Sequence, residues 1–165
     1  MNGNEIQPIK EKTSPKDIFL HLLAIVTLYV SAVSFGTLVF QYINIFFPDP
    51  LQDGYYYGRS AYSSIRWSIA TLVVVFPVHM FTMWVLNKSY LTSPSKRDLR
   101  IRKWLVYLTL FLAAIVIIGD LVALIYNLLE GELTARFILK VLAVFFIAGS
   151  VFGYYFMDIR KHHTE

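Results

Sequence analysis

The residue best placed to do chemistry is Asp120, which stands in the middle of an apolar run from Trp104 to Leu129. A carboxylate at that depth in hydrocarbon is costly, so it needs a counter-charge or water. The next apolar run carries Arg136 and Lys140, which are four residues apart and share one helix face. We therefore expect Asp120 to pair with Lys140 or Arg136, with Arg66 as a third candidate.

Two uncharged residues, Gln41 and Asn127, are expected in the same polar layer. One interpretation is a structural ion pair that locks the bundle, because an intramembrane pair can satisfy its own charges. A second is an ion or proton pathway lined by Gln41, Arg66, Asp120, Asn127 and Lys140. A third is that a helix boundary lies elsewhere and leaves some of these groups in water.

His21 lies in the first apolar run and His79 in the second. In each run the histidine is in the half nearer the side of the membrane that is expected to hold both termini. Histidines at similar depth on neighbouring helices could ligate a haem iron. His21 is close to the membrane edge, however, and nothing else in the sequence indicates a haem pocket. We therefore prefer packed or interfacial histidines and keep haem binding as an alternative.

Two stretches carry small residues four apart, Ala32 with Gly36 and Gly149 with Gly153. This spacing lets two helices approach closely, although it is common. Nine residues separate Lys140 from Gly149, which places them on opposite sides of a helix. We expect the last helix to pack on two sides, where the second neighbour is the first helix or a second protomer.

A strongly basic segment separates the second and third apolar runs and contains Lys96, Arg97, Arg100, Arg102 and Lys103. Beside a membrane these side chains could contact anionic lipid headgroups. The simpler alternative is that they only fix the orientation of the helices in the bilayer.

Four apolar runs position these residues, and we place them at about 18–46, 65–86, 104–129 and 136–157. Each run reaches the ~20 residues that a helix needs to cross ~30 Å of hydrocarbon, where the backbone must satisfy its own hydrogen bonds. The chain is 56% hydrophobic over 165 residues, too apolar for a soluble core of this size. We predict an all-α, antiparallel bundle of four transmembrane helices over residues 18–157. A polar segment, 1–17, precedes it and a short tail, 158–165, follows it.

Lys and Arg are distributed unevenly between the two sides of this predicted bundle. Eleven of the fifteen flank the side that holds both termini and the 87–103 loop, and four flank the other. Because cytoplasmic loops carry the excess of Lys and Arg, we expect both termini in the cytoplasm. The expected location is the cytoplasmic membrane, crossed several times.

The sequence lacks the residues that several classes of function require. The chain has no cysteine, which excludes disulfides, thiolate metal sites and a cysteine nucleophile. No Gly-rich phosphate loop, nucleophile elbow or HExxH stretch is present. The net charge of +4 comes from residues that flank apolar runs, so it indicates membrane topology rather than nucleic-acid binding.

We therefore expect a non-enzymatic scaffold or accessory subunit with no metal and no cofactor. Its expected partners are the lipid bilayer, anionic headgroups, and a second copy or a larger membrane complex. An ion- or proton-conducting oligomer and a b-type haem protein remain the alternatives.

Distinctive blocks of sequence lie in the second half of the chain: Arg102–Phe111, Gly119–Leu121, Gly131–Phe137, Leu139–Val141 and Gly149–Tyr155. Through these blocks, and over roughly residues 15–160, the chain resembles the bacterial membrane-protein family catalogued as domain of unknown function 5671. The resemblance implies a four-helix integral membrane protein and implies no activity. Asp120, Arg136 and Lys140 fall inside the blocks, whereas His21 and His79 do not, which weakens the haem alternative.

Overall fold

The computed structural model describes residues 13–48, 55–131 and 133–162, and this part of the chain is helical apart from short connections. Four long helices are α1 (Pro15–Phe46), α2 (Tyr55–Thr92), α3 (Arg100–Glu130) and α4 (Ala135–His162), and a short 3-10 helix, η1 (Pro94–Asp98), joins α2 to α3. All four are long and apolar enough to cross a membrane. The prediction of an all-helical chain with four candidate membrane spans is confirmed. Residues 1–12 of the expected polar segment and 163–165 of the expected tail lie outside the described residues.

The helices extend beyond the apolar runs that predicted them. α2 continues past Leu86 to Thr92, where Pro94 restricts the preceding residue to extended backbone and ends the helix. α3 ends at Gly131, whose φ of 76° is a left-handed conformation that costs glycine little. Hydropathy therefore located the spans, whereas local backbone chemistry decided where the helices end.

A capping box starts α1. The Ser14 side chain accepts from the backbone N–H of Asp17, and the Asp17 carboxylate accepts from the backbone N–H and the hydroxyl of Ser14. This reciprocal pairing satisfies N–H groups that the first turn leaves without partners. It also fixes Asp17 at the start of α1, where η1 can reach it.

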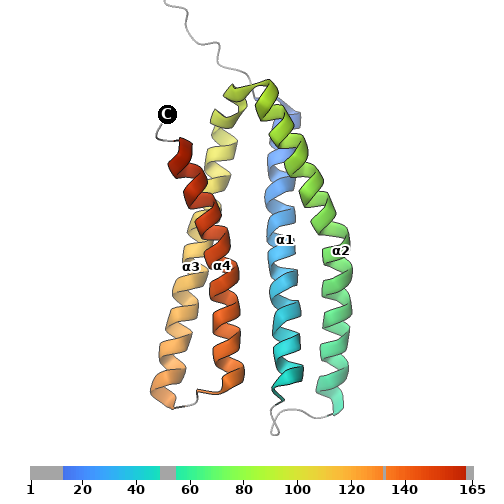
Figure 1. The fold of residues 1–165 in the computed structure, drawn as a ribbon, viewed down its shortest axis with the longest axis vertical. Coiled ribbons are helices and arrows are strands. Elements are labelled where there is room, and N and C mark those ends of the chain that lie inside the picture. Colours follow the sequence, from blue (N-terminus) through green and yellow to red (C-terminus); the bar gives the residue numbers. More distant parts are fainter. Residues whose placement is uncertain (1–12, 49–54, 132, 163–165) are drawn as a thin grey trace, which may run out of the picture.

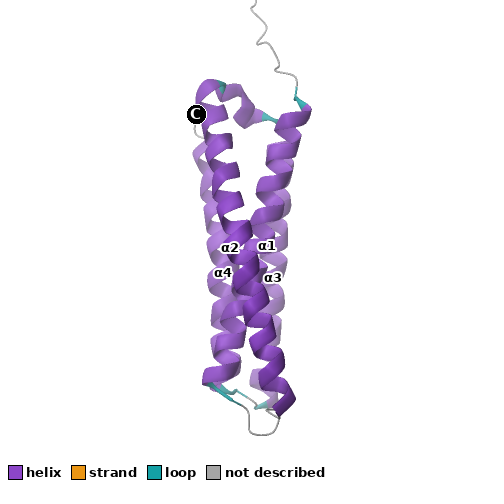
Figure 2. Cartoon of the chain, turned by 90° about the vertical axis from the view of Figure 1, so that its right-hand side faces the viewer, coloured by secondary structure: helices purple, strands orange, loops and turns teal. Residues whose placement is uncertain are grey.

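The helices form two hairpins, α1 with α2 and α3 with α4, and successive helices run in opposite directions along the long axis (Figure 1). The backbones of the two hairpins approach each other where α1 meets α4 and α3, whereas α2 reaches the second hairpin through its Tyr90 ring, which contacts Arg102 of α3. Figure 2 shows the same four helices after a turn of 90° about the vertical axis, with η1 and the start of α1 at one end. We call this the η1 end, and we call the opposite end, which holds the α3–α4 turn, the turn end.

The core is thin and much apolar surface faces outward. Val33, Phe81 and Phe146 expose 69%, 64% and 72% of their surface, as expected of side chains that meet lipid rather than protein. The main buried apolar cluster, Ala24 with Leu86 and Tyr90, lies between α1 and α2 toward the η1 end.

Candidate functional site

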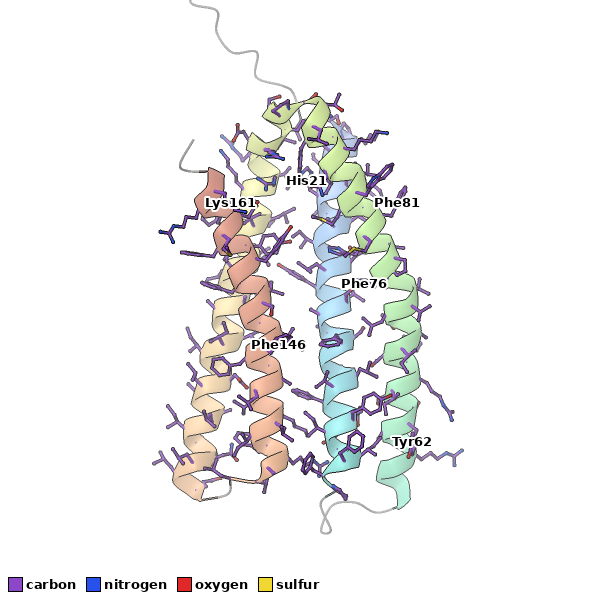
Figure 3. All side chains as sticks on the ribbon, in the orientation of Figure 1. His21, Tyr62, Phe76, Phe81, Phe146 and Lys161 are labelled. Carbon is purple, nitrogen blue, oxygen red and sulfur yellow. The ribbon has the colours of Figure 1, made fainter. Side chains whose placement is uncertain are left out.

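A pocket of about 270 Å³ opens at the η1 end and is lined by side chains from all four long helices and from η1. Figure 3 shows two of these residues on opposite hairpins near that end, His21 on α1 and Lys161 on α4. Part of the lining is apolar and buried, and it includes Ala24, Leu86, Leu105 and Val106. Another part is polar and mostly basic or aromatic, and it consists of Asn87, Tyr90, Arg97, Arg102, Tyr154, Tyr155, Asp158 and Lys161.

Tyr90 and His21 form the buried polar part of the pocket wall. The Tyr90 hydroxyl lies 2.6 Å from His21 Nε2, and His21 Nδ1 lies 2.6 Å from the backbone oxygen of Asp17. Because a carbonyl oxygen only accepts, Nδ1 donates to Asp17, and in the neutral ring Nε2 accepts from the tyrosine hydroxyl. Both nitrogens of His21 are therefore used within the protein.

Arg102 connects three elements around Tyr90. Its guanidinium donates to the Asp158 carboxylate of α4 at 2.6 Å and to the backbone oxygen of Arg97 in η1 at 3.1 Å. It also lies 5.5 Å from the centre of the Tyr90 ring, and the Arg97 guanidinium lies 5.6 Å from the same ring. Tyr90 thus receives two cation–π contacts while its hydroxyl bonds α1.

The basic segment divides by role. Lys96 forms an ion pair with Asp17 at 3.4 Å, which holds η1 against the start of α1. Arg102 is paired as described, and Lys103 makes an exposed pair with Asp98 at 3.7 Å that contributes little. Arg97 lines the pocket, and Arg100 is exposed outside it. These five residues were predicted together as headgroup contacts, yet two of them mainly connect parts of the protein.

The polar layer expected around Asp120 does not form. Oδ2 of Asp120 is buried without a hydrogen-bond partner, and the carboxylate makes no ion pair with any described residue. Lys140 lies over the Phe40 ring of α1 at 5.7 Å, and Arg66 is exposed on α2. The predicted pairing of Asp120 with Lys140, Arg136 or Arg66 was therefore wrong.

The hairpin geometry explains this outcome. Asp120 precedes the end of α3 by ten residues, and Lys140 follows the start of α4 by five. At 1.5 Å per residue they lie about 15 Å and about 8 Å from the turn, so their depths differ. Lys140 also faces α1 rather than α3. The residues proposed to line a conduction path are therefore not brought together.

The other members of the expected layer find closer partners. Arg136 Nε donates to Asn44 Oδ1 at 2.8 Å, and Asn44 Nδ2 donates to Gln41 Oε1 at 3.3 Å, which joins α4 to α1 at the turn end. Asn127 donates to the backbone oxygen of Ala123 on its own helix at 2.9 Å. The polar contact between hairpins at this end thus involves α1 rather than Asp120.

The two histidines do not form a haem clamp. His79 Nδ1 bonds Thr27 Oγ1 at 3.0 Å, and Thr27 is six residues beyond His21 on α1, about 9 Å along the axis. His21 has neither nitrogen free for a metal. The structure does not support the haem alternative, because the two rings sit at different depths. The described residues also contain no group of three or more His, Cys, Asp or Glu placed to hold a metal ion.

The model of a protein family described as a domain of unknown function, DUF5671, matches residues 17–155. The chain belongs to the DUF5671 family. The resemblance inferred from the sequence blocks is confirmed, and the match spans the four helices. Asp158 and Lys161, which line the pocket of this DUF5671 protein, lie beyond the matched residues. No curated protein and no solved structure matches the chain.

The small residues of this DUF5671 protein split into two kinds. A Cβ added at Gly36 would lie 3.6 Å from Ile147 Cδ1, so Gly36, next to half-buried Ala32, is where α1 and α4 approach. A Cβ at Gly149 or Gly153 would meet nothing within 4 Å. Gly149 therefore does not contact α1 within the chain.

Sequence reasoning missed the residues that organise the pocket, namely Asp17, Tyr90 and Asp158. Asp17 had a local signal, because Ser14 and Asp17 have the spacing of a capping box. Tyr90 and Asp158 stand in polar helix ends outside the apolar runs. Only the folded chain brings them to residues 69 and 56 positions away.

Proposed function

We propose that this chain is a non-enzymatic accessory protein of a bacterial cytoplasmic membrane, with both termini in the cytoplasm, which acts by binding a ligand at the η1 end. The unequal distribution of Lys and Arg supports the orientation, since the richer side is the one that holds η1. The apolar outer surface supports residence in lipid. No described constellation of side chains supports catalysis better than binding.

The observation that carries the proposal is the pocket lined from all four helices and η1. The two hairpins approach each other where α1 meets α4 and α3, and the contact of Arg102 with Tyr90 joins α3 to α2 beside the pocket. An occupant of the pocket would contact both hairpins, so it would stabilise one arrangement of them relative to others. Through such a ligand-dependent change of conformation, a small membrane protein can influence a neighbouring protein without catalysing a reaction.

Thermal unfolding in mild detergent tests the proposal. Purified, delipidated protein is mixed with an extract of host membranes, divided into a lipid fraction and a water-soluble fraction. A ligand that binds only the folded state raises stability, by about 2.7 kcal/mol at a hundredfold excess over its Kd. We expect one fraction to raise the midpoint by several degrees. If neither fraction changes the midpoint, the binding function is refuted.

A further inference from the structure

We propose that the η1-end pocket binds the phosphate group of an anionic amphiphile, with Arg97 as the main charge contact. This inference deepens the proposed function and rests on it. The shared chemistry is a phosphate ester, which a lipid headgroup or a free phosphate compound could present.

The charges that line the pocket favour an anion. Three basic side chains, Arg97, Arg102 and Lys161, stand against one carboxylate, Asp158. Asp158 is bonded to Arg102 at 2.6 Å, so it neutralises that guanidinium first. Arg97 makes no ion pair with a described residue, and its guanidinium contacts the Tyr90 ring. Its positive charge therefore remains available to a ligand in the pocket.

The contact with Tyr90 prepares Arg97 for this role. A cation–π contact uses the charge or the face of the guanidinium. The N–H donors of Arg97 therefore remain available for hydrogen bonds. Those donors form a planar fork that matches two oxygens of a phosphate. Tyr90 is itself fixed, since it is 8% exposed and its hydroxyl bonds His21 at 2.6 Å. A fixed ring lowers the entropy that Arg97 loses on binding.

The apolar residues of the pocket lining favour an amphiphile over a bare anion. Leu86, Leu105 and Val106 are 4%, 3% and 6% exposed and line the same pocket. At about 270 Å³ the cavity is just below the volumes of about 300–1,000 Å³ usual for ligand sites. A phosphate with glycerol and the first methylenes fits that size and that combination of polar and apolar lining residues. The η1 end also carries the basic segment that attracts anionic lipids to the membrane surface.

Ligand-dependent thermal shifts in detergent, measured over a titration, test the inference. The probes are short-chain (dihexanoyl) phosphatidate, the matching phosphatidylcholine as a zwitterionic control, glycerol phosphate and inorganic phosphate. Arg97→Gln is compared with Arg100→Gln, which removes the same charge from the same segment outside the pocket. Arg100→Gln is expected to keep the unliganded midpoint of the natural chain, whereas Arg97→Gln loses the contact with the Tyr90 ring and should lower that midpoint slightly. Each ligand-dependent shift is therefore measured from the unliganded midpoint of the same variant.

We expect phosphatidate to stabilise the natural chain and Arg100→Gln equally and to bind Arg97→Gln at least about tenfold more weakly, because a charge-assisted bidentate contact is lost. Equal binding of glycerol phosphate would support the phosphate site and assign it to a soluble ester. Should Arg97→Gln fail to fold, Asn87→Leu, at another polar residue of the pocket lining, takes its place, with a smaller loss expected.

Three results overturn the inference. If both arginine variants lose affinity equally, the attraction is a general surface charge and not this pocket. If no phosphate compound shifts the midpoint while a membrane fraction does, the pocket takes another ligand and the proposed binding function still stands. If neither the phosphate compounds nor the fractions act, both proposals fall together.

Discussion

At the scale of single residues, the carboxylates of Asp120 and Asp158 differ in their contacts, and thermal unfolding can measure the consequence. Asp120 has a buried Oδ2 with no partner, whereas Asp158 bonds Arg102 at 2.6 Å. Asp120→Asn removes a poorly solvated carboxyl group and breaks no ion pair, so we expect the unfolding midpoint in detergent to stay or rise. Asp158→Asn removes the negative charge opposite Arg102 and leaves only a neutral acceptor, so it should lower stability by about 1.5–3 kcal/mol.

The two substitutions control each other, because each replaces the same side chain by the same amide. A loss for Asp120→Asn as large as that for Asp158→Asn would show that Asp120 has a partner after all. Combining Asp120→Asn with Lys140→Ala should give additive changes, since no contact joins the two side chains.

The hydroxyl of Tyr90 offers a second residue-scale prediction. Tyr90→Phe keeps the ring that Arg97 and Arg102 contact and removes only the bond to His21 Nε2. A buried nitrogen is left unsatisfied, so we expect a loss of about 1–3 kcal/mol in the free energy of unfolding. The measurement is denaturant unfolding in detergent. Tyr107→Phe, on a side chain that is 54% exposed, is the matched control and should change nothing.

At the scale of helices, the contact between α1 and α4 depends on a position that only a small residue fits. Gly36→Leu adds three carbons beyond a Cβ that already lies 3.6 Å from Ile147 Cδ1. We expect overpacking to lower the midpoint by an amount equivalent to about 1–3 kcal/mol. Gly149→Leu meets open space and replaces a poor helix former, so stability should stay or rise.

The same pair of variants distinguishes the chain from an assembly. If Gly149→Leu lowers the midpoint as much as Gly36→Leu does, a second molecule covers Gly149. Size-exclusion chromatography with light scattering would then show a smaller particle for that variant, and the contact expected from the sequence would be one between protomers.

Which features of the helices could be predicted from the sequence depends on which forces act within a single segment. Hydropathy and helix length are properties of one segment, so the runs at 18–46 and 104–129 located α1 and α3. Which faces meet is set by the rotation and offset of each helix, which depend on packing between segments. The spacing of Arg136 and Lys140 correctly placed both on one helix, but it could not show that Lys140 turns to Phe40.

The pocket could not be predicted from the sequence for the same reason. Its polar wall joins Tyr90 on α2, Arg102 on α3 and Asp158 on α4, and each was an ordinary polar residue near a helix end. The basic segment was recognised as a cluster of charges. Its division into residues that brace the protein and a residue that faces the pocket appears only when η1 folds back on α1.

At the scale of the whole molecule, the two ends differ in how they join the hairpins. The η1 end uses ion pairs and cation–π contacts around a pocket, while the turn end uses Arg136 with Asn44 and Gln41. Between them α1 meets α3 through the Tyr29 hydroxyl and Thr109, 2.7 Å apart. A ligand at the η1 end therefore acts where the hairpins are held by groups that water and salt can reach.

The proposed orientation predicts which end each side of the membrane can reach, and the absence of native cysteine makes the test direct. Ser95 in η1 is exposed, and Leu133 near the α3–α4 turn is 41% exposed. In intact spheroplasts we expect a membrane-impermeant maleimide to label Leu133→Cys at once and Ser95→Cys only after permeabilisation. The natural chain, which has no thiol, is the blank.

The outcome bears on the ligand as well as on topology. Labelling of Ser95→Cys from outside and of Leu133→Cys only from inside would invert the protein. The excess of Lys and Arg would then lie on the side where the charge rule does not place it, and the pocket would face away from the anionic lipids of the cytoplasmic leaflet. Labelling of both from one side would mean that the helices do not cross the bilayer an odd number of times between Ser95 and Leu133. Since α3 alone separates these positions, that result would remove α3 as a membrane span.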